Sequence, residues 1–178
     1  MASGVRPTPW EIVRSTVVRS DRWITLRADD CRDARGREIG PYYVLEQPEW
    51  VSVLALTVGG EAILVEEYHH GAGVVSLSLV GGAVEDGESP REAAVRELRE
   101  ETGYAGDDVV DLGQTWANWG NQTNRVHHIL VRGCCLVGTQ ELDGGEIIEV
   151  ALTSVEGLGD RLVQSYNQLT WYKARAHL

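Results

Sequence analysis

The stretch GGAVEDGESPREAAVRELREETGY, residues 81–104, joins the signals of a glycine loop to those of a charged helix. Ser89 is expected to cap the helix N-terminus, and Pro90 suits the first helical position. Glu92 completes a capping box with Ser89. Gly103 is expected to end the helix. Both ends of this helix are therefore marked by local chemistry.

Three glutamates crowd the predicted helix: Glu97, Glu100 and Glu101. Like charges at adjacent and i, i+4 positions destabilise a helix by a few tenths of a kcal/mol per pair. At 3.6 residues per turn, the three side chains project within roughly a third of the helix circumference. Mg²⁺ and Mn²⁺ prefer carboxylate oxygens, so the cluster is a candidate metal site. A solvated charged face is the alternative for this helix taken alone.

The spacing of the whole segment extends the pattern. Gly82 is followed by five residues, Glu88, seven residues and then RELREETGY, residues 96–104. This resembles the Nudix box, G-x5-E-x7-R-E-U-x-E-E-x-G-U, in which U is a bulky apolar residue. Every fixed position matches, and only Tyr104 departs mildly, because an aliphatic residue is commoner there. Ala94 and Leu98, one turn apart, give the helix an apolar stripe suited to packing on a sheet.

The resemblance implies functions for the box residues. Divalent cations, Mg²⁺ or Mn²⁺, would be bound by the carboxylates of Glu97, Glu100 and Glu101 and by the carbonyl of Gly81. Glu88 and Arg96 would hold the loop to the helix. Gly82 would let the backbone approach phosphate closely. The implied reaction is hydrolysis of a phosphoanhydride, with the metals neutralising charge and lowering the pKa of an attacking water.

Beyond the box, the chain resembles the ADP-ribose and nucleotide-sugar pyrophosphatase branch of Nudix hydrolases. The N-terminal strands, VEEYHH, the box and WANWGNQTNR carry that likeness. It implies an α/β (α+β) fold in which a mixed β-sheet is sandwiched by helices, with an N-terminal small antiparallel sheet. Residues 1–47 would form the small sheet, which mediates a homodimer, often with exchanged strands. Residues 48–178 would form the Nudix hydrolase domain.

The loop after the box departs from the pattern of that branch, aromatic-x-Ser-Pro-Gly-x-x-x-Glu. Trp116 takes the aromatic place and Gly120 the glycine, but Trp119 stands at the proline and Asn124 at the glutamate. Glu67-Tyr68-His69 replaces the Gln-Tyr-Arg that the branch carries ahead of the box.

Asparagine cannot act as a carboxylate base, so the proton acceptor is expected elsewhere. The candidates are Glu100 and the acids of LDGGEIIEV, namely Asp143, Glu146 and Glu149. Among the later acids we favour Glu146. A solvent-facing residue is the competing interpretation for each of them.

Five residues are candidates for contact with a small-molecule nucleotide substrate: Trp116, Trp119, Arg125, Tyr68 and Gly82. The two tryptophans could stack on a base, although core or dimer packing is as good an explanation. Arg125 could contact phosphate or form a salt bridge. The pairs His69-His70 and His127-His128 suggest zinc only weakly, because adjacent strand residues point to opposite faces.

Short β-branched or alternating runs predict strands before and after the box. They cover residues 10–20, 23–31, 42–47, 51–58, 61–69, 74–80, 109–117, 125–137 and 146–153. Gly59-Gly60 is expected to close a hairpin. A C-terminal helix is predicted from about Val155, with Ser154 as its N-cap.

Composition bounds the class of protein. A chain of 178 residues with 43% hydrophobic content can bury a core. Its net charge of −11 comes entirely from residues 61–178, so nucleic-acid binding is not expected. Three cysteines are too few for a disulfide framework, which indicates a reducing compartment. The N-terminus lacks an apolar signal region and no run could span a bilayer, so we expect a cytoplasmic protein without a membrane partner.

Several functions fit the pattern. The leading hypothesis is metal-dependent hydrolysis of a nucleoside diphosphate joined to another moiety, with ADP-ribose or a nucleotide sugar as substrate. A Nudix hydrolase of nucleoside triphosphates and a non-catalytic nucleotide sensor on a Nudix fold are the alternatives. An allylic diphosphate isomerase would need a catalytic cysteine, and Cys31, Cys134 and Cys135 lack a recognisable context for that role.

Overall fold

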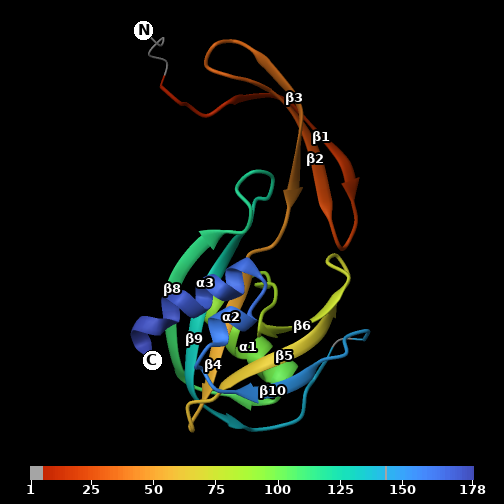
Figure 1. Cartoon of the computed structure of the whole chain (residues 1–178). Helices are drawn as coiled ribbons and strands as arrows, with labels where there is room; N and C mark the ends of the chain where they lie inside the picture. Colours follow the sequence, from red (N-terminus) through yellow and green to blue (C-terminus); the bar gives the residue numbers. More distant parts are fainter. Residues whose placement is uncertain (1–5, 143) are drawn as a thin grey trace. The chain divides into compact units, whose positions relative to one another are not determined.

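The computed structural model describes residues 6–142 and 144–178, and the chain divides into two compact units (Figure 1). The first unit comprises the chain up to Gln47 together with Trp116–Asn124. The second comprises Pro48–Thr115 and Arg125–Leu178. Asp143, one of the candidate bases, and the first five residues of the N-terminal segment lie outside the described residues.

The first unit is built on a three-stranded antiparallel sheet of order β1-β2-β3. Its strands are β1 (Glu11–Ser20), β2 (Thr25–Arg32) and β3 (Glu38–Glu46). Asp21 orders the turn after β1, because its carboxylate accepts the backbone N–H groups of Trp23 and Ile24 at 2.9 and 3.2 Å. The expected small N-terminal antiparallel sheet is confirmed.

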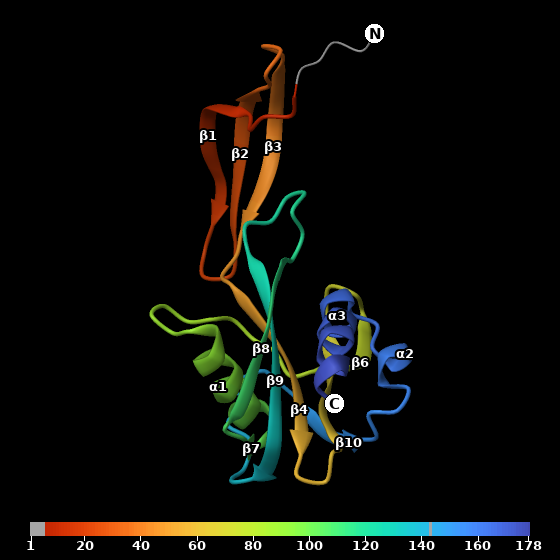
Figure 2. The same ribbon diagram turned by 90° about the vertical axis from the view of Figure 1, so that its left-hand side faces the viewer.

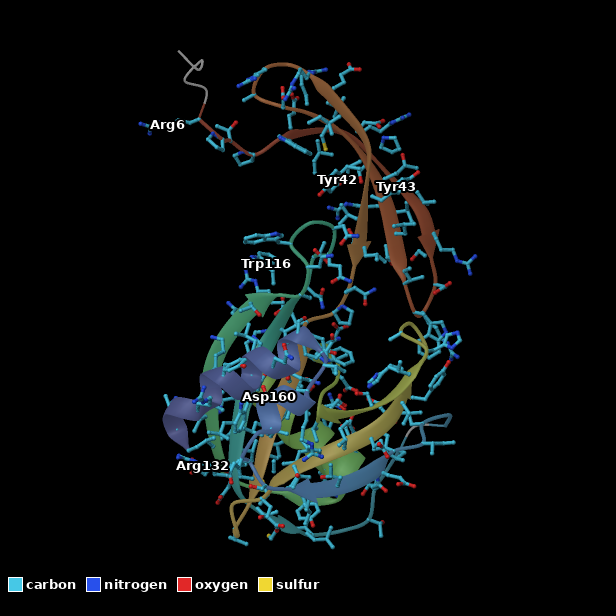
Figure 3. All side chains as sticks on the ribbon, viewed as in Figure 1. Arg6, Tyr42, Tyr43, Trp116, Arg132 and Asp160 are labelled. Carbon is cyan, nitrogen blue, oxygen red and sulfur yellow. The ribbon has the colours of Figure 1, made fainter. Side chains whose placement is uncertain are left out.

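The segment Trp116–Asn124 pairs with this sheet although it is distant in sequence. The backbone N–H of Leu45 donates to Asn121 O at 2.8 Å, and that of Thr123 donates to Leu45 O at 3.1 Å. The Tyr42 hydroxyl donates to the carbonyl of Gly120. Figure 3 labels Tyr42 and Tyr43 on β3 and Trp116 at the end of β8.

The second unit contains a larger mixed sheet of order β10-β5-β4-β9-β7, in which β6 also pairs with β5 and β8 with β9. Its strands are β4 (Trp50–Thr57), β5 (Ala62–His69), β6 (Val74–Leu79), β7 (Tyr104–Ala105), β8 (Asp108–Trp116), β9 (Arg125–Leu136) and β10 (Glu149–Thr153). The β4–β9 pair is parallel, whereas β4 and β5 form an antiparallel hairpin around Gly59-Gly60, as predicted.

Helices cover both faces of this sheet, which confirms the predicted sandwich (Figure 2). Successive β4 residues point to opposite faces because a strand has a period of two. On one face, Val51, Val53 and Ala55 join the buried cluster that contains Ala93, Ala94 and Leu98 of α1 (Pro90–Thr102). On the other face, Leu54 and Leu56 join the cluster that contains Trp171 and Ala174 of α3 (Ser165–Ala174).

Helix α1 (Pro90–Thr102) has the ends that its sequence predicts. Ser89 Oγ accepts the backbone N–H of Glu92 at 3.3 Å, and the Glu92 carboxylate accepts the backbone N–H of Ser89 at 2.9 Å. Gly103 follows in the left-handed conformation at φ 74°, which favours glycine. Ala94 and Leu98 are fully buried, as the apolar stripe predicted.

The prediction of one C-terminal helix from Val155 capped by Ser154 is wrong. The chain instead forms a short α2 (Leu158–Arg161), then α3 (Ser165–Ala174) and a 3-10 turn, η1 (Arg175–His177). Gly157 adopts φ 69° and Leu162 is extended, so no helix runs through both. The last strand also begins at Glu149 rather than at residue 146. Among the described residues, no helix is long and apolar enough to cross a membrane.

Candidate active site

The loop before α1 is fastened to the helix by Arg96. Its guanidinium donates to Glu88 at 2.9 and 3.0 Å and to the carbonyl of Ala83 at 2.9 Å. These hydrogen bonds from Arg96 hold the pKa of the Glu88 carboxyl below its usual range. The contact expected between Glu88 and Arg96 is therefore present.

Gly81 and Gly82 lie where a larger residue would not fit. A Cβ on Gly82 would overlap the carboxylate of Glu97, and one on Gly81 would lie 2.6 Å from the carbonyl oxygen of Val51. The backbone also pairs closely with β4, since Val51 N–H donates to Gly82 O at 2.9 Å. Glycine at both positions brings the loop against the carboxylates of α1.

Glu97 and Glu101 form the buried part of the glutamate cluster. The Glu97 side chain is 14% exposed, and burial raises the pKa of its carboxyl although Arg96 opposes the change. Burial, together with repulsion from Glu97, raises the pKa of Glu101 to about 9. Within residues 6–142 and 144–178, Glu101 Oε2 is buried without a hydrogen-bond partner. The fold thus holds two crowded carboxyls with an unsatisfied oxygen.

Glu100 lies apart from this pair. Its side chain is 39% exposed and accepts a hydrogen bond from Arg96 Nη1 at 3.0 Å. It borders a cavity of about 580 Å³ that Arg96, Arg99 and Glu141 also line. In the part of the chain that is described, no three His, Cys, Asp or Glu side chains are grouped closely enough to hold a metal ion. Here Arg96 neutralises both Glu97 and Glu100.

The residues beside the loop nevertheless have the chemistry of a divalent-cation site. The available donors are carboxylate and carbonyl oxygens, which hard cations prefer. Glu101 Oε2, which has no hydrogen-bond partner among the described residues, belongs to this group of donors. Gly82 lies against the carboxylate of Glu97, and the charges of Glu97 and Glu101 repel each other. A bound cation would reverse the effect of that repulsion on the pKa values.

A second cavity, of about 550 Å³, borders Glu101 and is called the Glu101 cavity below. Its lining includes Gly81, Glu101, Glu67, Glu146, Gln164 and Asn167. Three residues singled out from the sequence, Gly81, Glu101 and Glu146, thus meet at one place. Glu146 also raises the pKa of Glu101 by charge repulsion, though less than burial does.

The remaining substrate candidates belong to several different elements. Trp116 and Trp119 belong to the first unit and are 49% and 84% exposed. Arg125 begins β9 in the second unit. Within the described residues, the lining of the Glu101 cavity contains Glu67 and His69 but not Tyr68, which alternates to the opposite side of β5.

Asn124, at the position where the related branch carries glutamate, is 8% exposed and belongs to the first unit. Its side chain is an amide, which cannot accept a proton as the carboxylate of the related branch could. The proton acceptor therefore has to be sought elsewhere, as the sequence already suggested.

Sequence reasoning missed the part of the cavity wall that comes from β6 and α3. Ser78, Gln164, Tyr166 and Asn167 all line it. The β6 residue could have been found from strand alternation. The residues of α3 gave no such signal, because their place on the cavity wall depends on contacts with strands that are distant in sequence.

In the described parts of the chain, the histidine and cysteine residues belong to no group of three side chains that could hold a metal ion. His127 and His128 do point to opposite sides of β9, since His127 contacts Glu49 whereas His128 is fully buried against α3. Cys134 is buried, and burial raises the pKa of its thiol to about 11, which disfavours the thiolate.

Comparison with known proteins identifies the family. Residues 47–172 match the family model described as NUDIX domain. The chain belongs to the NUDIX domain family. The Nudix resemblance inferred from the box is thereby confirmed. Residues 10–45 of this Nudix chain also match a model described as nucleoside diphosphate sugar hydrolase N-terminal domain.

Individual relatives share parts of the chain. The Nudix chain is 30% identical to the ADP-ribose pyrophosphatase of Bacillus subtilis (strain 168) over 114 residues, 64% of this chain and 62% of that protein. It therefore spans less than two thirds of that relative. It is 26% identical to the methanol dehydrogenase activator of Bacillus methanolicus over 144 residues, 79% of this chain and 77% of that protein. With the ADP-sugar pyrophosphatase of Mus musculus it shares 47% identity over 58 residues, 32% of this chain and 27% of that protein.

A solved structure has the same fold. The crystal structure of an ADP compounds hydrolase superposes with a TM-score of 0.86 at 21% identity, covering 98% of this chain and 96% of that one. The predicted α+β Nudix architecture is thus confirmed.

Proposed function

We propose that this Nudix protein hydrolyses the phosphoanhydride bond of a nucleoside diphosphate joined to another moiety, with ADP-ribose or a nucleotide sugar as substrate. The observation that carries the proposal is the buried Glu97–Glu101 pair with its unsatisfied oxygen at the edge of the Glu101 cavity. The names of the relatives, ADP-ribose pyrophosphatase and ADP-sugar pyrophosphatase, support this class of substrate.

Mg²⁺ or Mn²⁺ is the proposed cofactor. The carboxylates of Glu97, Glu100 and Glu101 and the carbonyl of Gly81 would hold it. When bound, the cation neutralises charge on the diphosphate and lowers the pKa of a water molecule. The acidic character of the chain gives a second reason for a cation, because an anionic substrate would otherwise be repelled.

The protein's own residues position the reactants and move the proton. Arg96 keeps the loop of Gly81 and Gly82 fixed to α1 through Glu88 and Ala83. Glu146 is the proposed proton acceptor, with a carboxylate oxygen taking the proton from the attacking water. Its support is that it lies on the lining of the same cavity as Glu101.

The test is a hydrolysis screen with Mg²⁺ and Mn²⁺ over ADP-ribose, nucleotide sugars, dinucleoside polyphosphates and nucleoside triphosphates. Glu101→Gln should lower kcat about a thousandfold, because a cation ligand acting in the transition state is lost. The same change should leave the melting temperature equal or higher, because repulsion with Glu97 is relieved.

Glu141→Gln is the matched control, since Glu141 is an exposed acid on the other cavity. Full activity of Glu101→Gln would refute the assigned role. Preferred turnover of nucleoside triphosphates would select the alternative hydrolase. Nucleotide binding without any turnover in the wild-type protein would instead support a sensor.

We also propose that residues 1–47 form a dimerisation element and that the protein is a cytoplasmic homodimer. The exposed apolar side chains of β1 support the dimer. The thiols of Cys31, Cys134 and Cys135 are all free, which suits a reducing compartment.

A further inference from the structure

A chain of hydrogen-bonded polar side chains, buried except for the half-buried Thr115, connects the sheet of the second unit to α3. It begins at Thr115 on β8, whose hydroxyl lies 2.8 Å from His128 Nε2. His128 is fully buried on β9, and its Nδ1 lies 2.7 Å from Thr170 Oγ1 on α3. Both ring nitrogens therefore contact hydroxyl groups.

The series of hydrogen bonds continues through Ser52 on β4 and ends at Asn167. Thr170 Oγ1 donates to Ser52 Oγ at 2.8 Å, and its proton is shared with the carbonyl of Tyr166, also at 2.8 Å. Ser52 Oγ in turn donates to Asn167 Oδ1 at 3.0 Å. The last link thus uses the amide oxygen of Asn167 as its acceptor.

The donors and acceptors on either side of His128 can be assigned link by link. Burial lowers the pKa of His128 to about 4, so the ring is neutral near pH 7 and carries one N–H. Since the Thr170 hydroxyl donates onward, the N–H belongs on Nδ1 and Nε2 accepts from Thr115. Every link then points toward Asn167 Oδ1, which leaves the amide NH₂ group for other contacts.

Asn167 is only 3% exposed and lies on the lining of the Glu101 cavity. The NH₂ group of Asn167 can donate to a ligand in this cavity that offers an acceptor, and the burial of the residue strengthens such a hydrogen bond. Gln164, at the start of α3, lies on the same wall. The wall contributed by α3 is therefore polar but uncharged.

The charges around the cavity restrict what can fill it. Carboxyls of Glu67, Glu101 and Glu146 line it, whereas its lining among the described residues includes no lysine or arginine. A phosphate far from the cation would be repelled there. A neutral group with several hydroxyls can instead accept from the amide and donate to a carboxylate.

We propose that Asn167 is a specificity-determining residue whose Nδ2 donates to a hydroxyl oxygen of a neutral sugar held in the Glu101 cavity, with Thr115, His128, Thr170 and Ser52 fixing the orientation of its amide. The sugar is the group joined to the nucleoside diphosphate, so the inference rests on the proposed function. Thr170 and Ser52 act as positioning residues because they touch Asn167 or its partner and not the sugar.

The experiment compares binding of ribose 5-phosphate and inorganic phosphate by calorimetry in the presence of Mg²⁺. The wild-type protein should bind ribose 5-phosphate about tenfold more tightly, because only that ligand offers sugar hydroxyls. Asn167→Asp has the same shape and keeps an acceptor for Ser52 but removes the NH₂ donor. In that variant the preference should fall to about twofold or less.

Variants of Thr170, which positions the Asn167 amide, provide an independent test if Asn167→Asp fails to fold. Thr170→Val should also reduce the preference for ribose 5-phosphate, whereas Thr170→Ser, which keeps the hydroxyl, should restore it. A purely structural role would lower binding of both ligands equally. An unchanged preference in a folded Asn167→Asp or Thr170→Val protein, or no preference in the wild type, overturns the inference.

Hydrolysis separates this inference from the proposed function. If ADP-ribose is hydrolysed, kcat/KM should fall about tenfold in Asn167→Asp, chiefly through KM. If the wild type hydrolyses none of the phosphoanhydrides in the screen, the proposed function fails. The ratio of the two binding constants still decides whether Asn167 recognises the sugar.

Discussion

Two strands that both contain valine, β1 in the first unit and β4 in the second, are buried to opposite extents. All ten residues of β1 are exposed, whereas six of the eight residues of β4 are buried. Both strands are rich in valine, so intrinsic strand preference does not separate them. The strand β4 has a helix on each face, and the described part of the first unit contains no helix. The covering helices bury β4, whereas Glu11, Arg14 and Arg19 suit β1 to a surface that no described helix of its unit covers.

Polar groups follow the same contrast. In the first unit, Arg14 pairs with Asp30 at 2.6 Å with side chains 74% and 39% exposed. Such surface pairs contribute about 0–1 kcal/mol. In the second unit, the hydrogen-bonded side chains from His128 to Asn167 are buried, and a broken link between them would leave an unsatisfied group. Three experiments test this contrast: protonation of a buried histidine, truncation of buried and exposed valines, and a charge introduced on β1.

The largest expected effect is the loss of folding stability in acid that results from protonation of the buried His128. The pKa of His128 is lowered to about 4, so the folded state resists protonation that the unfolded state accepts near pH 6.5. Stability from this group is complete above pH 6.5 and falls as the pH drops toward 4. The total loss is about 3 kcal/mol. Urea unfolding at pH 7 and at pH 4.5 measures most of it.

The control for this prediction replaces a different histidine. His177→Gln, at an exposed position in η1, should keep the wild-type pH dependence. His128→Gln should lose stability at pH 7 but show a shallower decline with acid. Equal slopes in His128→Gln and the wild type would contradict the assignment.

A matched pair of truncations gives the next largest difference. Val53→Ala on β4 removes a fully buried side chain and should lower the free energy of unfolding by about 2 kcal/mol. Val17→Ala on β1 removes a side chain that is 61% exposed and should cost at most about 0.5 kcal/mol. Chemical denaturation of both proteins checks the comparison. Equal losses would show that β1 is covered in solution.

The smallest expected effect concerns the apolar surface of β1 as a dimer contact. Val17→Lys introduces a charge there and should raise the dimer Kd about tenfold, while the melting temperature changes little. Sedimentation or light scattering over a range of concentrations measures this. Val58→Lys, at an 82% exposed position in the β4–β5 turn, is the control and should leave the dimer intact. A monomeric wild-type protein would refute the dimer proposal itself.

Local signals account for what the sequence could predict. Helix α1 was placed correctly because Ser89, Glu92 and Gly103 fix its ends by contacts within a few residues. Most strands followed from the alternation of apolar residues. The C-terminal helices were misplaced because Ser154 has the chemistry of a cap yet accepts from Glu156 in a local turn. Leu162 is buried and extended, and it therefore separates α2 from α3.

In the candidate site, too, the residues marked by local sequence could be predicted, whereas those placed by long-range contacts could not. Glu97, Glu101 and Gly82 were found because they lie within one motif. Glu146 was only one of several acids, since its proximity to Glu101 depends on where the loop after β9 returns. Asn167 carried no sequence signal, because its orientation depends on Ser52, which lies 115 residues earlier in the chain.

The hydrogen bonds around His128 fix the tautomer of its ring. Thr170 has a single hydroxyl proton, which goes to Ser52 or to the carbonyl of Tyr166, so its oxygen accepts from Nδ1 of His128 in either case. The ring should therefore carry its proton on Nδ1 and none on Nε2 near pH 7. The ¹⁵N resonances of one buried imidazole then report, without any ligand, whether Thr170 of α3 still meets β9.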